Sequence, residues 1–208
     1  MTSVVVFDYG FGNVRSMVRA LDHIGADVQL TADLDEASRA DGVVIPGVGA
    51  FDACIRGLHA AGGDALVLSR IQHNQPVLGV CVGHQIMFDS SQEHGVSSEG
   101  LHLANGTVQL LKSPIVPHMG WNNVVAPSES KLFNHVEDEK FYFVHSYAVP
   151  LDANASKAES AVVSYCEYED DKFIAAYEDG ALCSTQFHPE KSGEAGLQLL
   201  KNWVQNFS

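Results

Sequence analysis

Basic residues are scarce in this sequence. Its 208 residues include 12 Lys and Arg against 26 Asp and Glu, which gives a formal net charge of −14. Neither Lys nor Arg is clustered, whereas nucleic acids and anionic membranes are bound through concentrated positive charge. The composition therefore argues against both as partners.

Cysteine is scarce as well, and no C-x-x-C pair occurs. The four cysteines stand far apart, at Cys54, Cys81, Cys166 and Cys183. This scatter is typical of free thiols in a reducing compartment rather than of a disulfide framework or a zinc site. We expect no metal site and no cofactor.

Long apolar runs are missing too. No stretch approaches the ~20 residues that cross a bilayer, and the first ten residues, MTSVVVFDYG, lack the basic region of a signal peptide. A cytoplasmic protein is expected. The hydrophobic fraction of 46% and the charged fraction of 18% predict one globular domain, residues 1–208.

The first half of the chain alternates apolar runs with helical periodicity. Such a β-α-β-α-β order predicts a parallel sheet with right-handed crossovers. Strands are predicted at 3–7, 27–31, 42–45 and 76–80, and helices at 14–24, 34–40 and 53–73, the last interrupted by two glycines.

The second half has shorter runs separated by turn residues, which indicate antiparallel strands. They are predicted at 107–111, 141–144, 161–165, 173–177 and 182–186. A last helix, 194–207, would pack through a stripe of Leu197, Leu200, Val204 and Phe207. The predicted fold class is a three-layer α/β fold with a mostly parallel central sheet, flanking helices and additional antiparallel strands in the C-terminal half.

The stretch 75–90, QPVLGVCVGHQIMFDS, joins a predicted strand to a helix that begins at Gly83, with Ile86, Met87 and Ser90 near one face. Its centre, G-V-C-V-G, is a nucleophile elbow with Cys81 in the place of serine. The following helix N-terminus favours the thiolate. The alternative is a buried core cysteine beside a glycine-rich turn.

A second motif, QFHPEKS, closes the predicted strands at 186–192. In an extended segment His188 and Glu190 would point to the same side, so that the carboxylate fixes the imidazole tautomer. With Cys81 they supply a Cys-His-Glu triad. Without it, a surface histidine beside a solvated glutamate would explain them.

A third motif, PGVGAF at 46–51, follows a predicted strand. Its glycines let backbone N–H groups converge into a cradle for an oxyanion or carboxylate. An ordinary glycine-rich connection fits the same residues, and the sequence alone leaves both open.

Together these motifs resemble the class I, triad-type glutamine amidotransferases over essentially the whole chain. The family elbow is commonly G-[IV]-C-L-G-x-Q; Val82 replaces the leucine here, at a position that acts through its backbone N–H. The blocks DYGFGN, HMGWN and FYFVHSY resemble the branch that forms the glutaminase subunit of imidazole glycerol phosphate synthases.

The resemblance implies glutamine as substrate, with Cys81 as nucleophile and His188, oriented by Glu190, as the proton carrier. The oxyanion would be held by backbone N–H groups, and the amino-acid part of glutamine by nearby side chains and backbone. The implied oxyanion residues are Val82 with Val48 or Gly49, and the implied substrate residues are Gln85, Glu93, His145 and Ser146. Alternatively, Glu93 is a solvated charge without a binding role. The segment 141–147 could likewise be an ordinary core strand.

The resemblance also implies a partner, a (β/α)8-barrel cyclase subunit that receives ammonia directly and makes imidazole glycerol phosphate and AICAR for histidine biosynthesis. Trp121, Tyr142 and Lys191 match positions at or near the interface of this heterodimer, although they also fit an ordinary surface. The sequence assigns no role to the side chains of His84 and His118.

Three other functions remain open at this point: a glutaminase for a different synthase, a cysteine hydrolase that acts without a partner on esters or γ-glutamyl peptides, and a non-catalytic binding subunit. The intact set of Cys81, His188 and Glu190 argues against the last.

Overall fold

The structure is a computed structural model that describes residues 1–151 and 159–206. Its strands are β1 (Ser3–Phe7), β2 (Asp27–Thr31), β3 (Gly42–Gly47), β4 (Val77–Cys81), β5 (Ser90–Ser91), β6 (Ser98–Glu99), β7 (Thr107–Leu110), β8 (His118–Asn123), β9 (Lys140–His145), β10 (Tyr147–Ala148), β11 (Val162–Tyr168), β12 (Asp171–Asp179) and β13 (Leu182–Thr185). Its helices are α1 (Val14–His23), α2 (Leu34–Arg39), α3 (Phe51–Ala60), α4 (Gly63–Gln72), α5 (Val82–Gln85) and α6 (Gly193–Gln205), with 3-10 turns η1 (Glu93–Gly95) and η2 (Pro189–Lys191).

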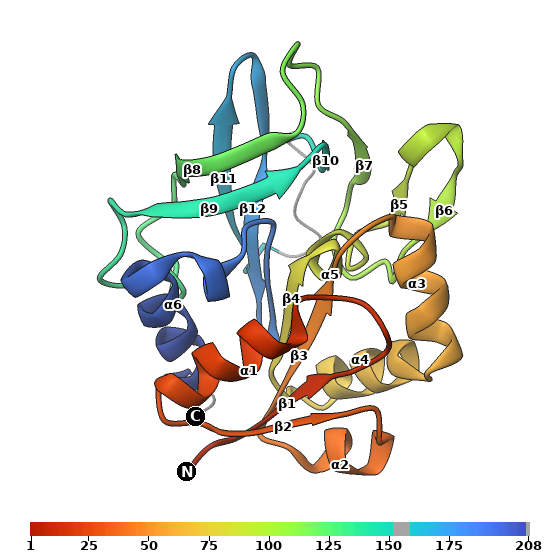
Figure 1. The fold of residues 1–208 in the computed structure, drawn as a ribbon, viewed down its shortest axis with the longest axis vertical. Helices are drawn as coiled ribbons and strands as arrows, with labels where there is room; N and C mark the ends of the chain where they lie inside the picture. The colour runs from red at the N-terminus through yellow and green to blue at the C-terminus, as the bar shows by residue number, and fades with distance from the viewer. Residues whose placement is uncertain (152–158, 207–208) are drawn as a thin grey trace.

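The central sheet has the strand order β11-β12-β13-β4-β3-β1-β2 within the described residues (Figure 1). The five strands from β13 to β2 run parallel, whereas β12 is antiparallel to both β11 and β13. The predicted fold class is therefore confirmed, including the antiparallel strands contributed by the C-terminal half.

The parallel register brings three strand ends together. Gly47 of β3 pairs with Cys81 of β4, and Thr185 of β13 pairs with Val80. Each of the three sequence motifs lies at one of these ends. Because ligands of parallel sheets bind beyond the carboxyl ends of the strands, the fold alone brings the three motifs to one place.

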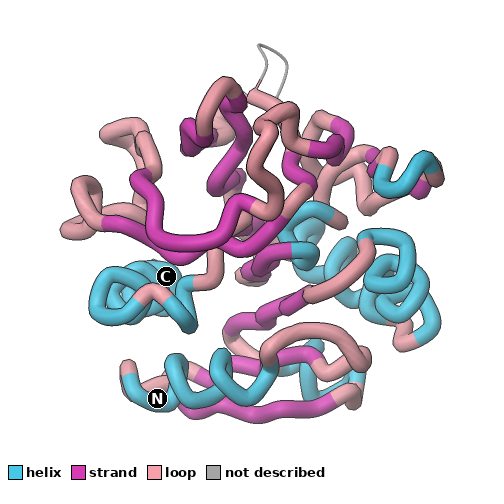
Figure 2. The backbone as a smooth tube through the Cα atoms, turned by 45° about the horizontal axis from the view of Figure 1, so that its top comes forward, coloured by secondary structure: helices cyan, strands magenta, loops and turns pink. Residues whose placement is uncertain are grey.

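Helices cover the sheet, as the cyan segments around the magenta strands show in Figure 2. Helix α1 packs against α6, while α4 packs against both α2 and α3. The crossovers β1-α1-β2 and β2-α2-β3 run in opposite directions along the sheet, so right-handed connections place α1 and α2 on opposite faces.

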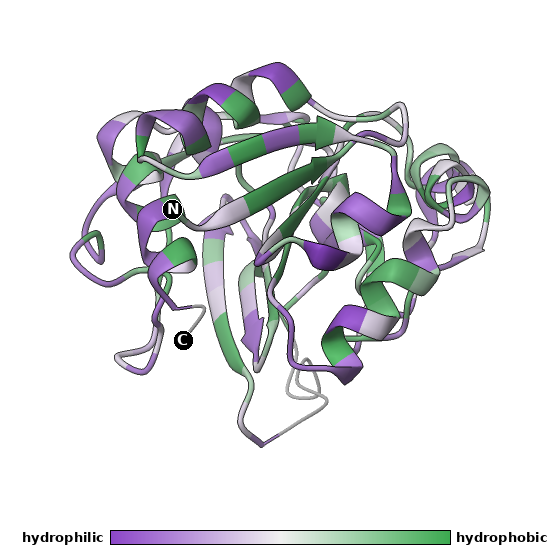
Figure 3. Ribbon diagram, turned by 90° about the horizontal axis from the view of Figure 1, so that it is seen from below, coloured by the Kyte–Doolittle hydropathy of each residue, from purple (hydrophilic) through white to green (hydrophobic). Residues whose placement is uncertain are grey.

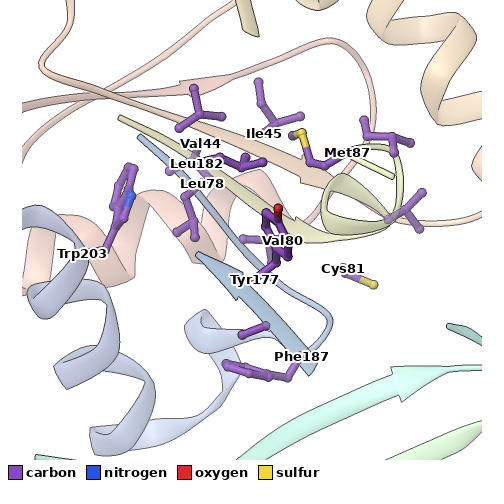
Figure 4. Packing of buried hydrophobic residues seen from close by; sticks show 14 of the residues in the cluster. Val44, Ile45, Leu78, Val80, Cys81, Met87, Tyr177, Leu182, Phe187 and Trp203 are labelled. Carbon is purple, nitrogen blue, oxygen red and sulfur yellow. The ribbon is translucent and has the colours of Figure 1, made fainter. Parts of the chain in front are cut away.

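The core lies on the inner strands, drawn mostly green in Figure 3. Strands β3 and β4 are buried along their whole length, and β1 at all but its first residue. In Figure 4 the sulfur of Cys81 points away from the other labelled side chains of the cluster. Burial on both faces explains why these strands read as continuous apolar runs.

Two predicted strands lie outside the central sheet. Residues of the predicted strand 107–111 form β7, which pairs with β5 and β10, and those of 141–144 form β9, which pairs with β8 in a separate two-stranded sheet. Strand β8 was not predicted, because Gly and Asn are poor strand formers and its pairing with β9 decides its conformation.

Two helix predictions were wrong in detail. Helix α5 ends at Gln85 instead of continuing to Ser90, because N–H groups of the loop 101–104 take the carbonyls of Ile86, Met87 and Phe88. In α6 the buried residues are Gly196, Leu199, Leu200, Asn202 and Trp203, so only Leu200 of the predicted stripe is fully buried. Phe207 lies outside the described residues.

Candidate active site

Cys81 occupies the sharp turn between β4 and α5. It has φ 58° and ψ −112°, a conformation that a non-glycine residue adopts only under constraint. The flanking glycines make the turn possible, since a Cβ at Gly83 would lie 2.0 Å from the Ile45 carbonyl oxygen and one at Gly79 would lie 2.5 Å from the Gly83 oxygen. The sequence pattern is thus a nucleophile elbow in three dimensions.

His188 and Glu190 follow β13 and form a buried ion pair. The imidazole Nδ1 lies 2.9 Å from Glu190 Oε1, and both side chains are 2% exposed. The expected extended segment is wrong at one point, because Pro189–Lys191 is a 3-10 turn. Proline at its first position presets φ and lets the turn form, and the turn still brings the carboxylate back to the ring.

The electrostatics of His188 follow from its neighbours. Burial by itself lowers the pKa of His188, but the Cys81 sulfur and the Glu190 carboxylate outweigh burial and raise the pKa to about 9. At neutral pH His188 is therefore an imidazolium beside the sulfur. Since Nδ1 is bound to Glu190, the other ring nitrogen, Nε2, is the one available to the Cys81 sulfur.

Cys54 is a second cysteine near the site, and its thiol is protonated and hydrogen-bonded. Burial raises the pKa of its thiol to about 12, so it stays protonated and donates to the Val48 carbonyl at 3.3 Å. Tyr9 donates its hydroxyl proton to the Pro46 carbonyl in the same loop. The glycine-rich loop 46–51 is thus held from two sides by buried donors.

A pocket of about 250 Å³ opens at Cys81. It brings together ten residues that the sequence singled out and two that it did not. The first group is Val48, Gly49, Cys81, Val82, Gln85, Glu93, His145, Ser146, His188 and Lys191, and the second is Val144 and Tyr147. Lys191 was predicted at an interface, and in the structure it lines this pocket.

Two of the predicted substrate residues have defined partners. Gln85 donates through Nε2 to the Tyr147 carbonyl at 2.8 Å and to Gln186 Oε1 at 3.0 Å. Glu93 accepts the N–H of Phe51 at 2.6 Å through Oε2, at the first residue of α3. The Glu93 carboxylate therefore stabilises a helix N-terminus as well as facing the pocket.

The other predicted interface residues lie on the two-stranded sheet. Trp121 of β8 is 53% exposed and its ring lies 6.1 Å from that of Tyr142, directly opposite on β9. Met119, two residues earlier, is 61% exposed. Met119 pairs with Val144 in the strand register, and Val144 lines the pocket, so these apolar residues lie next to the pocket wall.

The sequence did not single out Tyr147 and Gln186, whose polar groups accept hydrogen bonds from Gln85. Both belong to motifs that had been noted, but the Tyr147 carbonyl and the Gln186 amide act through contacts with Gln85, which is about 60 and 100 residues distant in the chain.

Within residues 1–151 and 159–206, no group of three or more His, Cys, Asp or Glu could hold a metal ion. Nor does any helix there have the length and apolar character needed to cross a membrane.

Comparisons with known proteins identify the family of this chain. The family model described as glutamine amidotransferase class-I matches residues 5–207. Imidazole glycerol phosphate synthase subunit HisH of Bifidobacterium longum is 53% identical, with 98% of this chain and 99% of that protein covered. Its counterpart from Streptomyces coelicolor is 54% identical, over 97% of this chain and 92% of that protein.

Among solved structures, PurLQS from Thermotoga maritima superposes with a TM-score of 0.72 at 16% identity, covering all of this chain and 99% of that one. At this identity the likeness establishes the fold. The family match and the full-length relatives establish more: the chain belongs to the class I glutamine amidotransferases and, within them, to the family of the imidazole glycerol phosphate synthase subunits HisH.

Proposed function

We propose that this chain is the glutaminase subunit of an imidazole glycerol phosphate synthase, which hydrolyses glutamine and delivers ammonia to a cyclase subunit. The observation that carries the proposal is the pocket at Cys81, where a strained elbow cysteine meets the buried His188–Glu190 ion pair. We also infer that residues 1–208 form a single glutamine amidotransferase domain, in keeping with one family match over 5–207.

In the proposed mechanism the Cys81 thiolate attacks the side-chain amide carbon of glutamine. The carbonyl electron pair moves to oxygen, and the oxyanion accepts hydrogen bonds from the N–H of Val82 and from the loop at Val48 or Gly49. His188 gives its Nε2 proton to the leaving nitrogen, so ammonia departs and a γ-glutamyl thioester remains. His188 then takes a proton from water, which attacks the thioester and releases glutamate and the thiolate.

Recognition of the amino-acid part of glutamine would use the opposite wall. Glu93 accepts the Phe51 N–H through Oε2, and its Oε1, which lies 4.0 Å from His94 Nε2, would receive the substrate ammonium. Gln85, His145 and Ser146 line the same cavity. Glutamine is a small, zwitterionic substrate, and a pocket of about 250 Å³ with convergent polar groups suits it.

The proposed partner is the (β/α)8-barrel cyclase, in a heterodimer. The docking face would be the exposed side of β8 and β9, formed by Met119, Trp121, Tyr142 and Val144. Exposed Trp and Tyr are the usual anchors of such interfaces. Val144 also lines the pocket, so a partner seated here would receive ammonia before it reached bulk water. The cytoplasm is the proposed location, because reducing conditions keep the free Cys81 active.

The function is tested by measuring glutamate formation from glutamine. We expect a low rate for the chain alone and a much higher rate with a histidine-pathway cyclase subunit and its ribotide ligand. Full activity without a partner would favour a free-standing hydrolase. Absence of glutamate under every condition, with the complex assembled, would rule out the glutaminase.

Replacing Trp121 by alanine is expected to weaken binding of the cyclase subunit by about 30-fold, the loss typical of a buried aromatic anchor. Isothermal titration calorimetry with the purified partner measures it. Leu68→Ala, which trims an exposed apolar side chain on α4, is the matched control and should bind normally. Equal affinities for the two variants would exclude Trp121 from the interface.

A further inference from the structure

Two buried histidines meet behind the pocket wall. His118 of β8 and His145 of β9 are directly opposite in the strand register. His118 Nδ1 lies 3.0 Å from His145 Nε2. Of the two, only His145 lines the pocket; the sequence assigned no role to His118.

The contacts at both ends determine where the protons lie. His145 Nδ1 is 2.9 Å from the Tyr147 carbonyl oxygen, which can only accept, so this nitrogen carries the proton. Burial lowers the pKa of His145 to about 3 and that of His118 to about 4, so each ring carries one proton. His145 Nε2 is then an acceptor, and His118 Nδ1 must be the donor.

The far end is consistent with this assignment. His118 Nε2 is left as an acceptor, and Asn122 Nδ2 lies 3.3 Å from it. The same amide nitrogen donates to the Glu167 carbonyl at 2.9 Å, while Asn122 Oδ1 accepts from the Asn123 N–H at 2.8 Å. Every donor in this series of hydrogen bonds meets an acceptor. The bonds therefore run in one direction, with Asn122 donating to His118, His118 to His145, and His145 to the Tyr147 carbonyl.

At its other end, this series of hydrogen bonds reaches the pocket through Tyr147. The Tyr147 carbonyl accepts from His145 and also from Gln85 Nε2 at 2.8 Å. Residues 144–147 form the wall that faces Cys81. The hydrogen-bonded chain therefore sets the position of the carbonyl that orients Gln85, and with it the shape of the glutamine cavity.

We propose that Asn122, His118 and His145 act as positioning residues of the glutamine pocket, a directional hydrogen-bonded chain that fixes the wall 145–147 and the Gln85 side chain. The role rests on the proposed glutaminase function. It concerns residues that stand outside the reacting atoms: neither Asn122 nor His118 lines the pocket.

Packing alone does not require these polar groups. The His118 ring stacks on Phe143 and Tyr168 with centroid distances of 4.8 and 4.1 Å, contacts that a phenylalanine would make equally well. A buried imidazole without partners is costly. The two-stranded sheet β8–β9 has no third strand within the described residues to hold its register. The hydrogen bond between the two histidines therefore helps to fix how β8 and β9 pair.

Two substitutions at His118 separate donation from packing. His118→Phe keeps the stacked ring and removes the donor, whereas His118→Asn loses the ring but keeps an amide N–H near the position of Nδ1. In the complex with the cyclase, we expect His118→Phe to raise the KM for glutamine about tenfold with kcat changed less than about threefold, the loss expected for one positioned hydrogen bond. His118→Asn should restore KM to within about threefold of wild type.

Asn122→Ala and Asn123→Ala form a matched pair on one strand. The first removes the donor to His118 and should raise KM in the same direction; the second trims an exposed neighbour and should leave KM unchanged. Equal KM values for wild type and His118→Phe, or an equal loss in His118→Asn, would overturn the proposal. If His118→Phe fails to fold, the asparagine pair still decides it.

Nitrogen-15 NMR of the imidazoles provides a readout that does not depend on activity. Both His118 and His145 should appear as neutral Nδ1–H tautomers at pH 7. An Nε2–H tautomer for His145 would refute the chain of hydrogen bonds. Should the wild-type complex form no glutamate, the proposed function fails, whereas these tautomers still test the chain itself.

Discussion

Replacing Cys81 by alanine is expected to lower glutamate formation by at least about 10⁴-fold, the usual cost of removing a catalytic nucleophile. Thioester formation needs the sulfur, and no other thiol can substitute. Cys54, near the same loop, has its proton engaged with the Val48 carbonyl and a pKa raised to about 12 by burial. The residual rate would come from the oxyanion donors and binding alone.

Coupled detection of glutamate in the activated complex measures this loss. Cys183→Ala is the control, since that residue lies at the start of β13, away from the pocket, and should keep full activity. Thermal unfolding of both variants verifies that the fold survives. A Cys81→Ala complex that retains more than about a tenth of the rate would remove Cys81 from the proposed mechanism.

The sequence predicted the central sheet well because its signals are local. Val4 to Phe7 and Val43 to Ile45 lie buried on both faces, so their strands appear as short apolar runs between turns. Strand β8 lacks such a signal: Gly120 and two asparagines form a strand only because β9 pairs with them. Local composition decides the first case, and tertiary pairing decides the second.

In the candidate site, too, some residues have a local sequence signal and others depend on tertiary contacts. Cys81, His188 and Glu190 could be predicted because each lies in a short motif whose chemistry is visible in the sequence, and the parallel register of β3, β4 and β13 brings those motifs together. Their roles stay predictions until the variants are measured. The pocket wall at Tyr147 and the partner of His118 could not be predicted, since they depend on a carbonyl orientation and on strand register.

The 3-10 turn at Pro189–Lys191 shows how a wrong local expectation can leave the chemistry intact. An extended segment would have aligned His188 with Glu190 through the two-residue period of a strand. The turn reaches the same 2.9 Å contact by folding back. What the chemistry constrains is the distance between Nδ1 and the carboxylate, and more than one backbone path satisfies it.

Glu190→Gln is expected to lower kcat by about 10² to 10⁴-fold, as removal of a triad carboxylate does elsewhere. Glutamine keeps an oxygen that can accept from Nδ1, so the tautomer is preserved, but the negative charge is lost. That charge is one of the interactions that raise the pKa of His188 to about 9. Without it the pKa of His188 falls, because burial is then opposed by the Cys81 sulfur but no longer by a carboxylate charge. The imidazolium that must protonate the leaving nitrogen is then less populated at neutral pH.

The pH dependence of kcat/KM distinguishes this cause from a loss of geometry. In the wild-type complex activity should fall as pH rises through about 9, where His188 of the free enzyme loses its proton. In Glu190→Gln this basic limb should move to lower pH by roughly one to three units, the effect of an adjacent opposite charge. Glu194→Gln removes an exposed carboxylate from the first turn of α6 and should keep the wild-type profile. A lower rate with an unmoved basic limb would mean that Glu190 acts through geometry and that its charge does not set the protonation of His188.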